Sequence, residues 1–374
     1  MKTPKVILID VIDPQTDKVE ALKSMEELEN LVDTYGGFVI IKKVQKKQIP
    51  NYKTYIGSGK LTAIIEEAKE KGVSMLIFNN LLKPQQLFNI QWRLEKEGIK
   101  VWDRVDLILK IFEKHASTSE AKLQIELAAL RHMGPRIFGM GLELSRQAAG
   151  IGTRGKGETN VEIMKRHLAN QEKKIREKLA KVQKMHEGQR RARKRKGLKT
   201  VAIVGYTNAG KSQLLSALTE KKVKVKNELF ATLDTRIGRL YLPQSHSQCL
   251  LSDTIGFIQK LPPDLIDAFK STLDEAIHAD LLLHVVDYSD KKREMKIRVV
   301  QAILEELGVS DTPTLMVCNK MDAVKKPATK TFERKYKKQS PTFISALQKV
   351  NLGELVGKVE GKIISANPDR NSPE

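Results

Sequence analysis

Gly205-Tyr206-Thr207-Asn208-Ala209-Gly210-Lys211-Ser212 is a complete G-x-x-x-x-G-K-S phosphate-binding loop. Apolar residues 201–204 precede it and a helical pattern over 213–218 follows, which is the strand–loop–helix setting that the motif requires. The two glycines let backbone N–H groups point inward at phosphate oxygens, Lys211 brings a positive charge to the β- and γ-phosphates, and Ser212 offers a hydroxyl to Mg²⁺. A chance glycine turn is the alternative, but the full context favours a nucleotide-binding P-loop domain of the α/β class.

A second motif indicates the base of the nucleotide. Asn319-Lys320-Met321-Asp322 follows the apolar run 314–318. Asp322 can accept hydrogen bonds from the ring N–H and the exocyclic amine of guanine, whereas adenine would leave that carboxylate unpaired. Asn319 can tie this side of the site to the phosphate loop, and Lys320 can lay its alkyl stem along the base. Ser345-Ala346 follows a short predicted strand at 342–344, where a backbone N–H can reach the guanine oxygen, so the pattern predicts GTP and GDP as ligands.

The stretch between these motifs carries two switch elements. Asp253-Thr254-Ile255-Gly256 follows apolar residues, so Asp253 can hold Mg²⁺ through water and the Gly256 N–H can meet a γ-phosphate. Phe230-Ala231-Thr232-Leu233-Asp234 lies earlier, where the first switch is expected, and Thr232 is the best candidate for a second Mg²⁺ ligand. An ordinary loop threonine is the alternative for Thr232. Five ordered elements at workable spacing predict a GTPase.

Two positions bear on how GTP would be hydrolysed. Many GTPases place a glutamine directly after the D-x-x-G glycine to orient the attacking water, but here that residue is Phe257. The catalytic group is therefore not identified, and we expect slow intrinsic hydrolysis that a partner stimulates. Asn208 resembles the phosphate-loop asparagine of GTPases that use K⁺, although an asparagine that only favours a tight turn is the commoner explanation.

The composition of the chain indicates its partners. Its 374 residues suffice for two or three domains, and the formal net charge is +21. A charge this high is unusual for a plain metabolic enzyme and predicts a polyanionic partner, either nucleic acid or an acidic membrane face.

Cysteine usage and the N-terminus indicate the compartment. Cys249 and Cys318 sit in apolar runs, so we expect buried thiols of a reduced compartment and neither a disulfide nor a metal site. The apolar runs are all shorter than the ~18 residues of a spanning helix. The chain starts with a strand pattern and early aspartates, unlike a targeting peptide. We expect a cytoplasmic protein without membrane insertion, with peripheral attachment as the alternative.

The first 114 residues alternate between strand and helix patterns. They predict an N-terminal α/β domain with a small parallel sheet. Strands are expected at 5–11, 37–42, 74–78 and 100–102, and helices at 18–35, 61–71 and 84–97. The stretch 56–60, Ile-Gly-Ser-Gly-Lys, resembles a second phosphate loop but lacks its full spacing, so a tight turn before a helix is the more frequent explanation.

Two long helical patterns follow, at 117–133 and 158–195, and predict an antiparallel hairpin over 115–197. The second ends in a basic block for which we expect contact with RNA phosphates, with a solvated helix face as an equally weighted alternative. The block contains Arg190, Arg191, Arg193, Lys194, Arg195 and Lys196, and the first five of these are the predicted contacts.

The segment 134–157 between the two patterns is rich in glycine and is predicted to be a loop. A loop of this length inside a domain is unusual unless it is functional or disordered. Glycine permits close backbone approach, and arginine offers bidentate phosphate donors. We therefore expect the loop to enter folded RNA, with a flexible loop that binds nothing as the alternative. Its basic residues are Arg136, Arg146, Arg154 and Lys156.

Several of these stretches together resemble the HflX GTPases. The resemblance rests on 56–60, 123–127, 150–159, the phosphate loop, 230–234 and 253–262, and extends over about 5–365. It implies a cytoplasmic, monomeric GTPase that binds the 50S ribosomal subunit, splits or rescues stalled ribosomes, notably under heat stress, and directs the hairpin loop toward the peptidyl transferase centre. A helicase-like enzyme that remodels rRNA with NTP is the alternative, and a non-catalytic ribosome-bound protein is a third hypothesis.

The chain also departs from the family pattern. After Asp234 the family usually has Pro-Thr-Thr-Arg, but this chain has Thr235-Arg236-Ile237-Gly238, so the ordering of the first switch is in question. The GTP-binding domain is expected over 198–366, followed by a polar tail at 367–374.

Overall fold

The computed structural model describes residues 3–17, 21–22, 25–148, 154–219, 229–230, 236–259, 265, 269, 273–325 and 329–365. The chain divides into two compact units. Unit 1 comprises Met1–Lys114 and Lys122–Leu179, and unit 2 comprises His115–Ala121 and Ala180–Glu374. The long second helix of the predicted hairpin therefore contributes its first part to unit 1 and its last part to unit 2.

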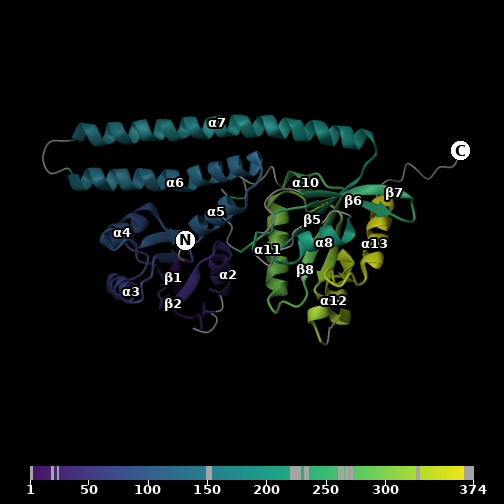
Figure 1. Ribbon diagram of the computed structural model, residues 1–374, viewed down its shortest axis with the longest axis horizontal. Coiled ribbons are helices and arrows are strands. Elements are labelled where there is room, and N and C mark those ends of the chain that lie inside the picture. Colours follow the sequence, from purple (N-terminus) through teal and green to yellow (C-terminus); the bar gives the residue numbers. More distant parts are fainter. Residues whose placement is uncertain are drawn as a thin grey trace. The chain divides into compact units, whose positions relative to one another are not determined.

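Unit 1 is built on a four-stranded parallel sheet in the order β2-β1-β3-β4. The strands are β1 Lys5–Ile12, β2 Phe38–Lys46, β3 Met75–Phe78 and β4 Lys100–Asp103. Helices α3 Ser58–Glu70 and α4 Pro84–Leu94 cover one face, and α2 Glu26–Tyr35 and α5 Arg104–His115 lie on the other (Figure 1). Short helix η1, Glu95–Glu97, follows α4. The alternating pattern predicted this sheet, but the sequence analysis did not identify α5.

The stretch around Gly57 forms a turn at the start of α3 rather than an open phosphate loop. The Gly57 N–H donates to Gln45 Oε1 over 2.9 Å, and Lys60 Nζ donates to the Val44 carbonyl over 2.7 Å. Both groups are thus used to attach α3 to β2.

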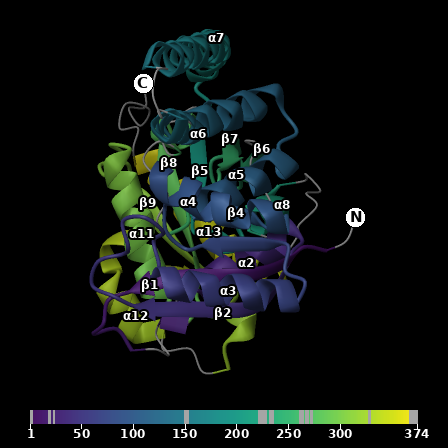
Figure 2. The same cartoon turned by 90° about the vertical axis from the view of Figure 1, so that its left-hand side faces the viewer.

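The hairpin is formed by α6 Ser119–Ala148 and α7 Arg154–Arg195. The two helices lie beside each other (Figure 1, Figure 2), joined by an Arg131–Glu172 ion pair of 3.2 Å. The predicted loop 134–157 is too long, because both helices extend into it. A glycine inside a helix costs only about 1 kcal/mol relative to alanine, so glycines weaken a helix without forbidding it. Residues 149–153 lie outside the described part of the chain.

Unit 2 contains a six-stranded sheet in the order β10-β9-β8-β5-β7-β6, in which only β6 runs antiparallel to its neighbour. Its strands are β5 Thr200–Gly205, β6 Arg236–Leu242, β7 Ser247–Asp253, β8 Leu281–Asp287, β9 Thr314–Asn319 and β10 Thr342–Phe343. The sequence analysis identified β5, β7, β9 and β10 but neither β8 nor β6.

Helices cover both faces of this sheet. Side chains of α8 Lys211–Leu218 and α13 Leu352–Ser365 share one core cluster with the strands, and those of α11 Arg293–Glu306 and α12 Thr329–Lys335 share another. Three shorter helices, α10 Asp274–Ile277, η2 Met321–Ala323 and η3 Lys337–Gln339, complete the described elements. Because β5, β7, β8 and β9 are oriented alike, their carboxyl ends meet at one edge of the sheet, where ligands of such sheets bind.

Two features relate to the compartment predictions. Cys249 and Cys318 are buried free thiols, and burial raises the pKa of each to about 12. Among the helices of the described residues, none is long and apolar enough to span a membrane.

Candidate nucleotide-binding site

The phosphate loop joins the end of β5 to the start of α8. Gly210 precedes α8 with a φ of 94°, a left-handed conformation that glycine adopts without strain. A Cβ at Gly210 would lie 2.2 Å from Asn319 Nδ2. The loop backbone therefore passes so close to Asn319 that only glycine fits here.

Lys211 lies buried under this loop. Its Nζ donates to the Tyr206 carbonyl over 2.9 Å. Burial lowers the pKa of Lys211 to about 8, and the nearby Asp253 carboxylate only partly offsets this effect. An anionic ligand would stabilise the buried ammonium of Lys211, so the site is suited to bind the phosphates of a nucleotide.

Ser212 and Asp253 are brought together from two elements. Ser212 lies in the first turn of α8 and donates through Oγ to Asp253 Oδ2 at the end of β7, over 2.7 Å. Both groups offer the hard oxygen ligands that Mg²⁺ prefers. The residues therefore fit an Mg²⁺ ion held by the Ser212 hydroxyl, with Asp253 reaching it through water.

The base side of the site is organised by Asn319 at the end of β9. Its Nδ2 donates to the Ala209 carbonyl over 3.0 Å, and its Oδ1 accepts from the Ala346 N–H over 3.0 Å. The link that the sequence predicts between Asn319 and the phosphate loop is thus present. Ser345 is buried beside Ala346, and its Oγ accepts from the Gln348 N–H over 3.1 Å.

Lys320 and Asp322 follow on the rim of the site. Lys320 adopts a φ of 64° and its Nζ pairs with Asp287 Oδ2 at the end of β8 over 2.7 Å. Asp322 lies in η2 next to Met321 and is exposed, so its carboxylate is open to a guanine edge. Sequence analysis did not identify Asp287, whose strand was missed.

The start of the second switch is attached to the phosphate loop by its backbone. The Thr207 N–H donates to the Phe257 carbonyl over 2.8 Å, and the Phe257 N–H donates to the Gly205 carbonyl over 3.1 Å. The Phe257 ring is 2 % exposed. A Cβ at Gly256 would lie 2.8 Å from Thr207 and 2.9 Å from Lys211 Nζ, so glycine is needed at this contact too.

Tyr206 and Thr254 strengthen this attachment. The Tyr206 hydroxyl accepts from the Gln259 N–H over 2.8 Å, while Lys296 Nζ lies 4.7 Å from the centre of the Tyr206 ring. The Thr254 hydroxyl donates to the Ile203 carbonyl over 2.7 Å, and the neighbouring Ile255 is buried. The sequence motif did not indicate a role for the Tyr206 side chain.

The described part of the first switch consists of Phe230 and the strand that begins at Arg236. Ala231, Thr232, Leu233 and Asp234 lie outside the described residues, so the assignment of Thr232 to Mg²⁺ stays a prediction. Phe230 is buried with a φ of 57°, and its carbonyl lies 3.1 Å from His115 Nδ1. The departure that begins at Thr235 is partly resolved, because β6 starts at Arg236 and its Gly238 packs against Thr219.

His284 is a buried neighbour of the phosphate site that sequence analysis missed. It lies in β8 beside Val204 of β5 and is 2 % exposed. Burial, followed by the positive charge of Lys211, lowers the pKa of His284 to about 4. The imidazole is therefore neutral, so His284 adds no second positive charge beside Lys211.

Known families and proteins match most of this chain. Residues 22–113 match the family model of the GTP-binding GTPase N-terminal region, 115–193 that of the GTP-binding GTPase middle region, and 200–320 that of the 50S ribosome-binding GTPase. The GTPase HflX of Caldanaerobacter subterraneus subsp. tengcongensis is 42% identical over 359 residues, covering 96% of this chain and 80% of that protein. The chain belongs to the HflX GTPase family.

Other members and a solved structure agree with this assignment. GTPase HflX of Escherichia coli is 40% identical over 301 residues, covering 80% of this chain and 70% of that protein. A GTP-binding protein of Sulfolobus solfataricus, solved in complex with GDP, is 28% identical with a TM-score of 0.51, covering 97% of this chain and 99% of that one. As a member of this family, whose GTP-binding part matches over 200–320, the chain is a GTPase.

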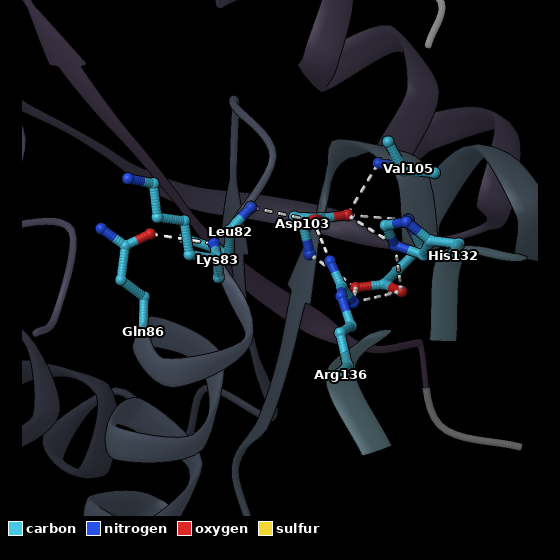
Figure 3. Close-up of polar contacts among 8 residues, drawn as sticks. Leu82, Lys83, Gln86, Asp103, Val105, His132 and Arg136 are labelled. Carbon is cyan, nitrogen blue, oxygen red and sulfur yellow. Dashed lines mark hydrogen bonds and ion pairs between the residues drawn. The ribbon is translucent and has the colours of Figure 1, made fainter. Parts of the chain in front are cut away.

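The basic residues predicted to bind RNA fall into three groups. Arg136 of α6 is 3 % exposed, and its guanidinium pairs with Asp103 and, over 2.8 Å, with Asp106 (Figure 3). Arg136 therefore stabilises the packing of unit 1, and in this arrangement its guanidinium does not face an RNA ligand. The side chains of Arg146, Arg154 and Lys156 lie outside the described part of the structure.

The third group is the block at the end of α7. Arg190 pairs with Asp274, and Arg193 pairs with Glu275 over 2.8 Å. Arg191, Lys194 and Arg195 are exposed. These three present their charges to solvent, whereas Arg190 and Arg193 are paired within unit 2.

Proposed function

We propose that this GTPase binds the 50S ribosomal subunit in the cytoplasm and splits or rescues stalled ribosomes, with GTP hydrolysis stimulated by the ribosome. The family assignment supports the proposal, because its GTP-binding part matches the model described as a 50S ribosome-binding GTPase. The net charge of +21 favours an RNA-rich partner. We expect the protein to act as a monomer.

The observation that carries the dependence on a partner is the placement of Phe257. Its side chain is buried and its backbone is hydrogen-bonded to the phosphate loop, so the position that carries a water-orienting glutamine in many GTPases offers no hydrogen-bonding side chain here. We therefore propose that contact with the large subunit rearranges this switch or supplies the missing group.

The remaining residues have defined tasks in this scheme. Lys211 and the backbone N–H groups of the loop bind the β- and γ-phosphates, and Asp322 selects guanine. Asn319 links the phosphate loop to the segment that binds the base. Mg²⁺ would be held by Ser212, Thr232 and, through water, Asp253, where it would neutralise charge that develops on the phosphates. Exposed Arg191, Lys194 and Arg195 would contact rRNA phosphates.

Asn208 is the residue that would hold a K⁺ ion at the same site. It adopts a φ of 61° within the phosphate loop, which also suits a simple turn. GTP turnover in K⁺ and in Na⁺, for the wild type and for Asn208→Ala, separates these explanations. A K⁺ dependence that the variant loses supports the ion, and equal turnover in both salts refutes it.

Sedimentation of 70S ribosomes tests the function directly. The protein is added with GTP, GDP or a non-hydrolysable GTP analogue, and the fraction of free 50S and 30S particles is measured. Splitting with GTP and with the analogue but not with GDP would show that GTP binding drives separation. GTP turnover with and without 50S particles completes the test, because equal rates and intact 70S particles would contradict the proposal.

A further inference from the structure

The backbone around Lys320 is fixed on both sides by neighbouring segments of unit 2. The Asn319 carbonyl accepts from the Tyr288 N–H over 2.9 Å. On the other side, the Met321 N–H donates to the Ile344 carbonyl over 3.2 Å. Lys320 itself adopts a φ of 64°, a left-handed conformation that persists only where the surroundings determine it. The backbone of Lys320 is therefore held in place, and its long side chain is the part that still has rotational freedom.

Asp287 restricts this remaining freedom. It ends β8, directly beside Asn319 of β9 in the sheet. Its Oδ2 pairs with Lys320 Nζ over 2.7 Å, and the side chains of Asp287 and Lys320 are 18 % and 29 % exposed. Its Oδ1 accepts from both the N–H and the hydroxyl of Ser289, over 3.0 and 2.6 Å. Because Ser289 orients the carboxylate, Asp287 presents a fixed acceptor to the ammonium of Lys320.

The position of the Lys320 side chain matters for the base of the nucleotide. Lys320 lies between Asn319, which is bonded to the phosphate loop, and Asp322, which is exposed at the rim of the site. A lysine stem can cover a flat apolar surface while its ammonium stays in polar surroundings. Ordering a long side chain during binding weakens affinity, and a side chain that is ordered beforehand avoids this loss. A stem fixed in advance would contact the face of the base but not the edge that distinguishes guanine.

We propose that Asp287 is a positioning residue for nucleotide binding, which holds the Lys320 stem where it meets the face of the base. Base recognition is then divided between two carboxylates. Asp322 selects guanine by its edge, whereas Asp287 acts through Lys320 and raises the affinity for any purine. Nucleotide binding does not require ribosomes, so a failure of this pairing would leave the proposed ribosomal function untouched.

The other end of β8 provides a matched control. Asp280 directly precedes this strand and pairs with Lys199 over 3.1 Å, and the side chains of Asp280 and Lys199 are 33 % and 30 % exposed. The Asp280 carboxylate also accepts from the N–H and the hydroxyl of one further residue, Thr200, over 2.8 and 3.1 Å. Asp280→Asn therefore removes the same charge and the same kinds of bonds as Asp287→Asn, but at the amino end of the strand, away from the nucleotide site.

Titration of the full chain with a fluorescent GDP analogue measures Kd. We expect Asp287→Asn to raise Kd about three- to tenfold, the effect of having to order one long side chain during binding. Asp280→Asn should leave Kd within about twofold of the wild type, because the two sites are independent. Both substitutions make the protein more positive, which favours an anionic ligand, so net charge cannot explain a weaker affinity. Unchanged Kd in Asp287→Asn, or an equal rise in Asp280→Asn, overturns the proposal.

Lys320→Met tests whether Asp287 acts through Lys320. Methionine keeps an unbranched, flexible stem but lacks the ammonium, so its position does not depend on Asp287. We expect Asp287→Asn to raise Kd in the wild-type background and not to raise it further in the Lys320→Met background. An equal rise in both backgrounds would show that Asp287 acts without Lys320, which also overturns the proposal.

GTP turnover and base preference distinguish positioning from a general loss of structure. Asp287→Asn should raise KM and leave kcat within about twofold of the wild type, because the base is contacted equally in the ground state and the transition state. Competition of GTP, XTP and ATP should show an unchanged preference for guanine, and a lost preference would contradict the division between Asp287 and Asp322. A purely structural role would instead lower the thermal midpoint and the fraction of protein that binds, with Kd unchanged.

Discussion

Asn319 donates a 3.0 Å hydrogen bond to the Ala209 carbonyl, and this bond joins the base-recognition strand to the phosphate loop. The same side chain accepts from the Ala346 N–H, so one amide links three segments that are far apart in sequence. The nucleotide site is therefore already assembled in the folded chain by a residue whose side chain has both a donor and an acceptor.

Asn319→Ala is expected to weaken both GTP and GDP binding by about 10- to 100-fold. The substitution leaves a buried carbonyl and a buried N–H without partners, at about 1–3 kcal/mol each. Titration with a fluorescent GDP analogue measures the loss. Asn89→Ala is the control, because Asn89 donates a similar 2.9 Å bond to Lys53 in unit 1. Equal affinity in the two variants would contradict the role of Asn319.

Asp322→Asn is expected to change the base preference of the site from guanine to xanthine. A carboxylate accepts from both guanine N–H groups, whereas an amide can accept from the ring N–H and donate to the xanthine oxygen. We expect GTP binding to fall by about 10²-fold or more, because a group left unpaired costs several kcal/mol. Competition of GTP, XTP and ATP for the site provides the measurement, and an unchanged GTP preference would show that Asp322 does not contact the base.

The affinity for GTP is expected to fall above pH 8. Burial lowers the pKa of Lys211 to about 8 in the empty site, and bound phosphates raise it by stabilising the ammonium. Below pH 8 the lysine is protonated in both states, so Kd is flat. Above pH 8 binding must take up a proton, and Kd rises toward about tenfold per pH unit. Calorimetry at pH 7 and pH 9 in buffers of different ionisation enthalpy detects this proton, and its absence at pH 9 would refute the prediction.

Phe257→Gln is expected to leave basal GTP turnover within about twofold of the wild type, although it restores the residue that many GTPases carry. The side chain at this position is buried and the backbone on both sides of it is bonded to the phosphate loop. Burying an amide without partners should instead lower the free energy of unfolding by about 1–3 kcal/mol. Phe257→Leu, which keeps an apolar side chain, serves as the control. A rise of tenfold in turnover would show that the side chain reaches the nucleotide.

The nucleotide site could be predicted from sequence because its chemistry restricts the residue types. A phosphate loop needs glycines and a lysine at fixed spacing, and guanine needs a carboxylate after a strand, so these positions are recognisable without a fold. The central strand β8 was missed because a short apolar run such as 281–287 cannot be distinguished from a buried helix by periodicity alone. Its absence from the predicted elements also concealed His284 and Asp287.

The partners of charged residues could not be predicted in the same way. Arg136 and Arg193 both stood in basic, apparently solvent-facing stretches, yet the fold pairs each with acidic residues distant in sequence. Charge patterning along a chain shows where cations are but not which face of a helix they occupy once it packs. The extent of α6 was underestimated because a glycine inside a helix costs only about 1 kcal/mol relative to alanine and does not end it.

A cluster of charged residues around Arg136 contributes to the stability of unit 1, and the unfolding of this unit can be followed separately. Arg136 and His132 of α6 contact Asp103 at the end of β4 and Asp106 in the first turn of α5 (Figure 3). Burial would raise the pKa of Asp106, but the His132 hydrogen bond and the Arg136 charge outweigh it and lower that pKa to about 2. Both tryptophans of the chain, Trp92 and Trp102, lie in unit 1, so their fluorescence reports its unfolding.

Arg136→Ala is expected to destabilise unit 1 by about 3–5 kcal/mol, because it leaves two carboxylates with less compensation in a buried site. Urea unfolding followed by tryptophan fluorescence measures the effect. Arg176→Ala is the control, since the Arg176–Glu172 pair is largely exposed and such pairs contribute about 0–1 kcal/mol. Similar losses in the two variants would show that the cluster is no stronger than a surface pair.

His132 should make the stability of this unit fall at alkaline pH. Burial alone would lower the pKa of His132, but hydrogen bonds to Asp103 and Asp106 outweigh burial and raise it above 6.5. A raised pKa means that the folded state binds the proton more tightly than the unfolded state. The stabilisation is therefore complete below pH 6.5 and is lost as the pH rises through the folded value. Between pH 6 and pH 9 the urea midpoint of the wild type should fall more than that of His132→Gln, and parallel curves would show that His132 is not protonated in the cluster.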